Sequence, residues 1–312
     1  MLLQLHAQIS SWWHGTPLPA RTPANIKFQR WNHYTNGRWI PLARNTPSTV
    51  APHPSPGRLE VVTWNVDAGS PSPGPRISAL LQTIEAMANA DVIFLQDVNK
   101  AAIAQLLAHP WIQQQWYSSE ADDSKFGKQS FATVTLISKI CLFNHSISLG
   151  PIWRVSLPSR FDRDALCCDL VSNKTPQTKG LARIRLINVH LDSLPINPSR
   201  RPQQLSIIAS YLRAAGHGLV AGDFNPVLPE DDEIVSDNGL VDAWTYLRPS
   251  DPGFTWGARG DKPFPPNRLD KVALHNLTPS NIRILQTSSI KHDCTDLEFS
   301  DHLGLSCVFT WN

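Results

Sequence analysis

The chain has 312 residues, which is enough for one large domain or two small ones with a sizeable buried core. Its composition, 41% hydrophobic and 17% charged, is ordinary for a globular protein. The formal net charge is only +2, so binding of nucleic acid would have to depend on a local basic patch. No apolar stretch is long enough to span a bilayer, and the short apolar start lacks the features of a signal peptide. We therefore expect no membrane association.

The five cysteines are scattered along the chain and show none of the paired spacings of a metal site. An odd, scattered set of cysteines is typical of reduced thiols. We therefore expect an intracellular protein.

Residues 1–57 are expected to form an N-terminal extension with an aromatic hairpin and a proline-rich linker. Asn36 and Gly37 stand between aromatic residues, and this arrangement is a strong short-range signal for a hairpin. A hairpin packed on the core is favoured over an aromatic platform for a ligand. Four prolines between residues 47 and 56 indicate the extended linker.

Residues 58–312 are expected to form the main domain, in which buried strands are mixed with covering helices. Strands are predicted at residues 59–65, 91–97, 131–143, 164–171, 181–190, 219–225, 268–274 and 304–309. Helices are predicted at residues 76–89, 100–108 and 203–215. The strands 131–143 and 164–171 are expected to be neighbours. This mixture favours a layered α/β sandwich, and the absence of a glycine-rich phosphate loop argues against a nucleotide-binding fold.

Polar residues follow the predicted strands at their ends. The stretch 219–225 has three apolar residues, a glycine that allows a turn, and then Asp223 and Asn225. Taken alone, this pattern is more typical of a turn than of catalysis. Five further stretches are similar: Thr63-Trp64-Asn65, Leu95-Gln96-Asp97, His190-Leu191-Asp192-Ser193, Arg268-Leu269-Asp270 and Ser300-Asp301-His302. Since strand ends can converge on one rim of a sheet, the set predicts a site.

Some of these residues offer hard oxygen ligands for a metal ion. Asp97 and Asp301, with Asn65 nearby, suit Mg²⁺ or Mn²⁺. Such an ion polarises a phosphoryl oxygen and stabilises a leaving group. The structural alternatives are that Asp97 caps the helix beginning near Lys100 and that Asp301 belongs to an ordinary loop.

The remaining residues fit acid–base chemistry on a phosphate ester. The carboxylate of Asp270 would fix the tautomer of His302 and favour its imidazolium, which can donate to a phosphate oxygen. His190 is a second candidate donor. Asp223 would take a proton from the attacking water, and Asn225 would orient that water. Each residue alone also fits a structural role, but their joint occurrence in this order favours a site.

The ordered set of motifs from Thr63-Trp64-Asn65 to Ser300-Asp301-His302 resembles the endonuclease/exonuclease/phosphatase superfamily over about residues 59–311. This resemblance implies a DNase I-like, four-layered α/β sandwich, made of two packed mixed sheets flanked by helices. It also implies a divalent metal ion, Mg²⁺ or Mn²⁺, at one rim. Carried over by position, Asp223 and His302 are catalytic and Asp270 orients His302.

The resemblance assigns further roles to the motif residues. Asn65, Asp97 and Asn225 shape the metal and water site, whereas His190 and Ser193 hold the scissile phosphate.

Within the superfamily, the spacing is most similar to the branch of DNA-repair enzymes that hydrolyse the bond between a tyrosine and a 5′ DNA phosphate. The similarity implies DNA 5′ ends, with a covalently attached tyrosyl peptide, as the substrate. Single-stranded DNA ends are commonly held by a basic groove with aromatic stacking surfaces, and the candidates for this role are Arg163, Arg201, Trp244, Trp256 and Arg268. For the two tryptophans, packing in the core is the favoured alternative. We expect a monomer in the nucleus and/or the cytoplasm.

Three positions depart from the pattern of that branch. Asp97 stands where the family usually has Glu, and one methylene less moves the carboxylate away from an ion that is strict about distance. Pro195 replaces an Arg that would contact DNA, and Leu303 replaces a Trp. Hydrolysis of another phosphate ester, or binding of DNA ends with weakened catalysis, are the alternative functions.

Overall fold

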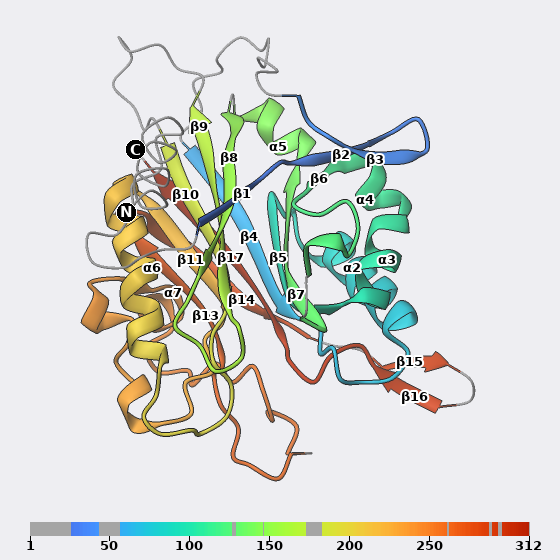
Figure 1. The fold of residues 1–312 in the computed structure, drawn as a ribbon. Coiled ribbons are helices and arrows are strands. Elements are labelled where there is room, and N and C mark those ends of the chain that lie inside the picture. The colour runs from blue at the N-terminus through green and yellow to red at the C-terminus, as the bar shows by residue number, and fades with distance from the viewer. Residues whose placement is uncertain are drawn as a thin grey trace.

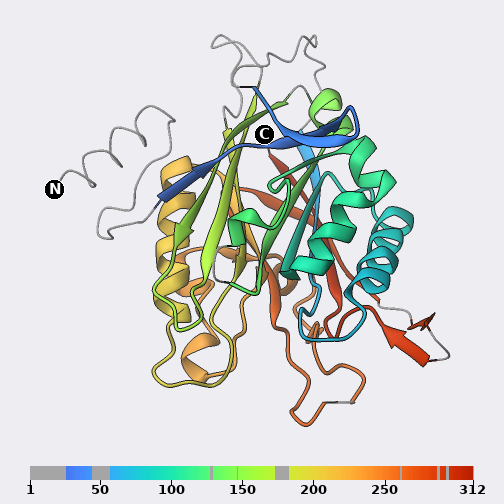
Figure 2. The same ribbon diagram turned by 45° about the vertical axis from the view of Figure 1, so that its right-hand side comes forward.

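The computed structural model describes residues 26–43, 57–126, 129–145, 147–172, 183–260, 262–286, 289–292 and 295–311. Two β-sheets lie face to face, and helices cover their outer faces (Figures 1 and 2). The predicted four-layered α/β sandwich with two mixed sheets is confirmed.

One sheet has seven strands in the order β1-β8-β9-β10-β11-β13-β12. These strands are β1 (Ile26–Gln29), β8 (Ile147–Ser156), β9 (Asp164–Ser172), β10 (Arg183–His190), β11 (Gly218–Asp223), β12 (Val241–Asp242) and β13 (Asp270–His275). Helix α6 (Arg201–Ala215) covers the outer face and buries Leu205, Ile208 and Leu212 against it.

The other sheet has eight strands in the order β14-β17-β4-β5-β7-β6-β2-β3. These strands are β14 (Thr278–Leu285), β17 (Gly304–Trp311), β4 (Gly57–Asn65), β5 (Val92–Asn99), β7 (Phe131–Ser138), β6 (Trp116–Ser118), β2 (Asn32–Thr35) and β3 (Arg38–Pro41). Its outer face is covered by the helices α2 (Pro73–Met87), α3 (Lys100–Ala108) and α4 (Pro110–Gln115).

The remaining elements are short. They comprise the helices α5 (Lys139–Asn144) and α7 (Ala243–Leu247), the 3₁₀ turns η1 (Ser124–Phe126), η2 (Pro229–Asp231) and η3 (Ser236–Asn238), and a separate hairpin of β15 (Ser289–His292) and β16 (Thr295–Glu298). Within the described ranges, no helix combines the length and the apolar character needed to cross a membrane.

Strand direction explains why the polar strand ends meet. β10 and β11 run parallel and pair His190 with Asp223, whereas β13 runs antiparallel and pairs its first residue, Asp270, with Asp223. In the other sheet β4 and β5 are parallel and pair Asn65 with Gln96. The carboxyl ends of these four strands and the start of β13 therefore share one rim.

The strand predicted at 131–143 is wrong beyond Ser138, where the chain turns into α5. The side chain of Ser138 accepts a hydrogen bond from the backbone N–H of Cys141 and caps the helix. The strands 131–138 and 164–172 are not neighbours, contrary to expectation, because β7 and β9 belong to different sheets. The unpredicted strand β8 pairs with β9 instead.

The hairpin predicted at Asn36 and Gly37 forms as β2 and β3, and both turn residues have positive φ, 49° and 75°. Strand β2 pairs with β6, and β1 pairs with β8, so backbone hydrogen bonds join residues 26–41 to both sheets. The predicted linker at 47–56 lies outside the described residues.

Four cysteines, at 141, 167, 168 and 307, are free and buried, and Cys294 lies outside the described residues.

Candidate active site

Three polar side chains lie in one row across neighbouring strands of the seven-stranded sheet. They are His190, Asp223 and Asp270, which are 5%, 1% and 0% exposed. Gly222 precedes the central member with φ +145°, and a Cβ atom there would lie 1.9 Å from the Val189 carbonyl oxygen. Only glycine therefore allows β10 and β11 to pack this closely beneath the row.

Asn65 reaches the row from the opposite sheet, so the site is closed between the two sheets. Its Nδ2 donates to Asp223 Oδ2 at 3.0 Å. Its backbone carbonyl accepts from Ser300 Oγ at 2.5 Å, and Ser300 Oγ accepts from the N–H of His302 at 3.0 Å. The segment that carries His302 is thereby fixed to the end of β4.

His302 and Asp270 form the predicted carboxylate–imidazole pair. His302 Nδ1 donates to Asp270 Oδ2 at 2.8 Å. Burial alone would lower the pKa of His302, but the charges of Asp270, Asp223 and Asp301 outweigh burial and raise it to about 10. His302 is therefore an imidazolium at neutral pH. Its Nε2 lies 4.0 Å from both Asp223 Oδ2 and Asp301 Oδ1, and it can donate to a phosphate oxygen.

Asp223 has the protonation behaviour of a general base. Burial raises its pKa to about 7, although the charge of His302 and hydrogen bonds from Asn65 and Asn225 oppose the rise. The backbone N–H of Asn225 donates to Asp223 Oδ1 at 3.0 Å, from a turn in which Asn225 has φ +48°. A carboxylate with a pKa near 7 can take up a proton from water and release it again at neutral pH.

The ligand atoms of Asp223, Asp270 and His302 lie within 4.8 Å of one another, which is also close enough for a metal ion. However, His302 Nδ1 is already engaged with Asp270, and an imidazolium repels a cation. These two facts favour acid–base chemistry at this cluster.

A second group of donors lies on the other side of His190. Arg163 NH2 donates to Ser193 Oγ at 2.9 Å and to His190 Nε2 at 3.1 Å. Because a guanidinium only donates, His190 Nε2 accepts and the ring proton is on Nδ1. Burial, together with the charges of Arg163 and His302, lowers the pKa of His190 well below its usual value, so the ring is neutral. Arg163 and Ser193 are thus placed to hold an anionic group beside His190.

Asp97 occupies a bulge in β5 that turns its carboxylate into the site. The pairing of β5 with β7 shifts between Leu95 and Val98, and Asp97 has φ +59°. Its Oδ2 accepts from the N–H of Ala68 at 3.3 Å. Its Oδ1 is buried, has no hydrogen-bond partner among the described residues, and lies 3.6 Å from His190 Nδ1, which likewise has none there.

This orphaned carboxylate oxygen fits a hard divalent cation such as Mg²⁺ or Mn²⁺, which binds through one or two carboxylates while keeping water ligands. The two other predicted ligands take part in hydrogen bonds. Asn65 Nδ2 donates to Asp223, and its Oδ1 accepts from the N–H of Asp67 at 2.9 Å. Asp301 Oδ2 accepts from Trp256 Nε1 at 2.9 Å. Among the three predicted ligands, Asp97 is the one with a buried oxygen that has no partner among the described residues, and it is the first candidate to hold the ion.

Two of the predicted substrate-binding arginines are not brought to this cluster. Arg201 is 1% exposed and bonds to Asp231 Oδ2 at 2.8 Å and to the carbonyl of Asp192 at 2.7 Å, so it supports the loop that carries Ser193. Arg268 NH1 donates to both carboxylate oxygens of Asp242, at 3.0 and 2.8 Å. Trp256, in contrast, borders the site through Asp301.

Two residues that shape the site had no predicted role, although Gln96 lies in the motif Leu95-Gln96-Asp97. Gln96 is fully buried, and its Nε2 donates to Thr63 Oγ1 at 3.0 Å and to Asn188 Oδ1 at 2.9 Å, which joins the two sheets beneath the row. Phe131 stacks on His190, with ring centroids 6.1 Å apart, and lies under the Arg163 guanidinium at 5.0 Å. Neither contact has a sequence signal, because both join strands far apart in the chain.

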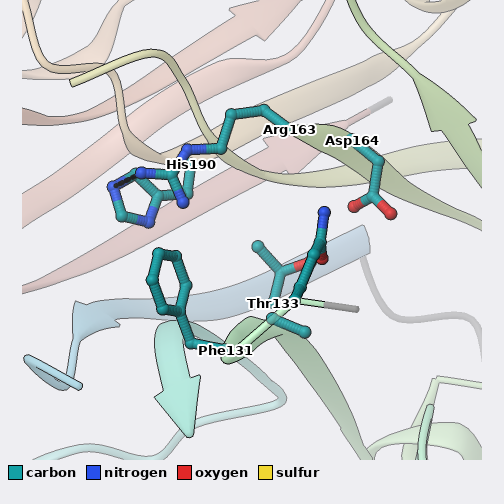
Figure 3. A pocket seen from close by; sticks show the side chains of 7 residues that line it. Phe131, Thr133, Arg163, Asp164 and His190 are labelled. Atoms are coloured by element: carbon teal, nitrogen blue, oxygen red, sulfur yellow. Dashed lines mark hydrogen bonds between the residues drawn. The ribbon is translucent and has the colours of Figure 1, made fainter. Parts of the chain in front are cut away.

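Figure 3 shows the pocket that these contacts border. It is lined by Gln129, Phe131, Ala132, Thr133, Arg163, Asp164 and His190.

The fold and this rim of acids, amides and histidines define a class of protein. The model of the Endonuclease/Exonuclease/phosphatase family matches residues 62–302. The chain belongs to that family, whose members are phosphoester hydrolases.

Several solved structures have a fold similar to that of this chain. TDP2 (tyrosyl-DNA phosphodiesterase 2) of D. rerio, in complex with a single-strand DNA product, superposes with a TM-score of 0.63 and 21% identity, covering 81% of this chain and 98% of that one. Truncated TDP2 of Caenorhabditis elegans gives a TM-score of 0.62 and 20% identity, covering 81% and 97%. A mannosyl-6-phosphatase of Bacteroides thetaiotaomicron gives 0.60 and 13%, covering 80% and 99%. No curated protein sequence matches the chain significantly. At these identities the structures establish a shared fold.

Proposed function

We propose that the chain is a divalent-metal-dependent phosphodiesterase that releases tyrosyl peptides from the 5′ ends of DNA. The observation that carries the proposal is the placement of His302, held by Asp270, opposite the buried carboxylate of Asp223. A proton donor and a proton acceptor thus face each other across a space of 4.0 Å. Such a pair can provide general acid–base catalysis of phosphodiester hydrolysis.

In this mechanism the scissile phosphate lies beside Arg163 and Ser193. The Arg163 guanidinium and the Ser193 hydroxyl hold the phosphate oxygens while His302 Nε2 donates to a phosphoryl oxygen. Asp223 takes the proton of the attacking water as the water oxygen bonds to phosphorus, with Asn225 orienting the water. The bond from phosphorus to the tyrosyl oxygen breaks, the tyrosyl oxygen takes a proton from solvent, and the products are a 5′-phosphate end and a free tyrosine hydroxyl.

Asp97 is the residue that would hold Mg²⁺ or Mn²⁺. When bound, such an ion polarises a phosphoryl oxygen and neutralises charge that develops on it. The carboxylate belongs to Asp97 in the bulge of β5. Its position in the site therefore depends on the left-handed backbone conformation of Asp97, with φ +59°.

Two observations support DNA as the substrate. The ordered motifs are most similar to those of tyrosyl-DNA phosphodiesterase 2, and the D. rerio enzyme was solved with a single-strand DNA product. Arg163 offers a cation close to the reacting atoms, as binding of a phosphate backbone requires.

A different phosphate ester is the second candidate substrate, and the loop after Ser193 favours it. Where the tyrosyl-DNA branch has an arginine, this chain has Pro195, flanked by Leu194 and Ile196, which are 58% and 37% exposed. An apolar loop fits a substrate with an apolar group near the phosphate better than it fits the DNA backbone.

Cleavage of a 5′-phosphotyrosyl single-stranded oligonucleotide tests the proposal. The assay compares Mg²⁺, Mn²⁺ and chelator, for wild type and for Asp97→Glu. Metal-dependent release of a 5′-phosphate end by wild type is the expected result. Activity only in Asp97→Glu would identify a site weakened by one missing methylene.

No cleavage by either protein would contradict the DNA proposal. Turnover of a phosphate monoester or of an apolar phosphodiester under the same conditions would then support the second candidate. Tight, metal-independent capture of DNA ends without turnover would indicate a binding protein instead.

A further inference from the structure

A second cluster of metal-ligand side chains lies at the opposite end of β5 from Asp97. Asp91 directly precedes β5, Cys141 lies in α5, and His145 is the C-terminal cap of α5. The ligand atoms of these three residues lie within 4.8 Å of one another. Asp91 and Asp97 are six residues apart in a largely extended segment, or about 20 Å. Figure 1 shows α5 at the end of the sandwich away from the active-site rim.

The backbone holds Asp91 in a fixed position. Its N–H donates to the carbonyl of Glu60 at 2.9 Å, and its own carbonyl accepts from the N–H of Ser138 at 2.9 Å. Its Oδ2 accepts from the N–H of Glu60 at 2.8 Å. Because Ser138 is also the N-cap of α5, the carboxylate and the helix are positioned together.

The two other ligands come from one helical turn. Cys141 and His145 are four residues apart, a spacing that places two side chains on the same face of a helix. The thiol of Cys141 hydrogen-bonds to the carboxylate of Asp91. Cys141 is buried, whereas Asp91 and His145 are half-buried, so solvent reaches the cluster from one side.

The donor set selects a class of metal ion. Sulfur, imidazole nitrogen and a single carboxylate suit Zn²⁺ and its analogue Co²⁺ rather than Mg²⁺, which prefers oxygen. Binding of such a cation to the Cys141 sulfur releases the thiol proton to solvent.

We propose that Asp91, Cys141 and His145 form a site for one Zn²⁺-class ion, with water as the fourth ligand, and that the ion fastens α5 to the start of β5. The site is independent of the phosphodiesterase activity.

Titration of the chelator-treated full chain with Co²⁺, in excess Mg²⁺, tests this site. Thiolate ligation produces a sulfur-to-cobalt charge-transfer absorption in the near ultraviolet. The candidate active site contains no sulfur among its described residues, so it cannot give this band. We expect a saturable band at one equivalent that Zn²⁺ removes, and a thermal midpoint that rises with Zn²⁺.

Matched variants assign the ligands. Cys141→Ser should abolish the band, and His145→Ala, at a half-buried position, should weaken Co²⁺ binding by more than about tenfold. Asp91→Asn retains an oxygen acceptor for the Glu60 N–H and removes only the negative charge of the carboxylate. Cys167→Ser changes another buried thiol and should keep the band.

No charge-transfer band in wild type would overturn the proposal, as would a band that persists in the Cys141→Ser/His145→Ala double variant. Thermal midpoints of all variants in chelator separate loss of ligation from loss of folding.

Discussion

His302 Nε2 and Asp223 Oδ2 lie 4.0 Å apart, which is too far for a hydrogen bond between two groups of opposite charge. Each is held by another partner: Asp270 binds His302 at 2.8 Å, and Asn65 binds Asp223 at 3.0 Å. The separation leaves room for a reacting group between an acid and a base. Three of the predictions below depend on this arrangement.

Asp223→Asn should lower turnover of the 5′-phosphotyrosyl oligonucleotide by about 10²–10⁴-fold, because the amide cannot accept the proton of water. Asparagine keeps the size of the side chain and an oxygen that can accept from Asn65. Steady-state kinetics measure the loss, and Asp237→Asn, at an exposed carboxylate, is the control. Equal activity of Asp223→Asn and wild type would exclude Asp223 as the base.

The same substitution should stabilise the fold at neutral and alkaline pH. Burial raises the pKa of Asp223 from 3.8 to about 7. Between these values the folded state binds more protons than the unfolded state, so the favourable contribution of Asp223 is lost as pH rises through about 7. The thermal midpoint of Asp223→Asn minus that of wild type should grow between about pH 5 and about pH 8. A difference that does not change with pH would rule out the raised pKa.

The pH dependence of kcat/KM should be bell-shaped. Activity should rise as Asp223 ionises near pH 7 and fall as His302 loses its proton near pH 10. Asp270→Asn removes the largest charge that raises the pKa of His302, so the alkaline limb should move to lower pH. Profiles of both proteins check this shift, and an unmoved alkaline limb would show that His302 is not the acid.

Asp97→Asn should raise the Mg²⁺ concentration needed for half-maximal activity by at least about tenfold, since a neutral amide is a weaker ligand. Asparagine also tolerates the left-handed backbone at φ +59°, so the bulge should persist. Activity as a function of metal concentration measures the effect, and circular dichroism confirms the fold. An unchanged metal requirement would place the ion elsewhere.

Gln96→Leu should destabilise the protein by about 1–3 kcal/mol, because it leaves Asn188 Oδ1 buried without its donor. Denaturant unfolding measures the loss. Gln105→Leu is the control, since Gln105 is exposed and donates an exposed hydrogen bond to Ser78, and this substitution should change stability by less than about 0.5 kcal/mol. Equal stabilities of Gln96→Leu and wild type would mean that the hydrogen bond between the sheets makes no net contribution to the free energy of unfolding.

The sequence was sufficient to predict site residues where a local pattern coincided with a strand end. The strand that ends in Asp223 and the motif Ser300-Asp301-His302 were recognisable because their order along the chain is specific to the family. The pairing of His302 with Asp270 was predictable for the same reason, and the structure gives it a distance of 2.8 Å.

Contacts across the two sheets were not predictable. Phe131 against His190 and Gln96 against Asn188 each join residues whose proximity depends on the packing of one sheet on the other. Helix α5 was missed for a different reason. Residues 131–143 are mostly apolar, and the end of the strand within them is marked by the cap at Ser138.

The register of β10, β11 and β13 has a consequence for heat inactivation. His190, Asp223 and Asp270 keep their mutual positions through backbone hydrogen bonds of consecutive ladder pairs, not through a flexible loop. A slip of one residue would turn each side chain to the other face of the sheet. These three side chains therefore keep their relative positions while the ladder is intact, and catalytic competence and the cooperative melting of the sheet should disappear together on heating.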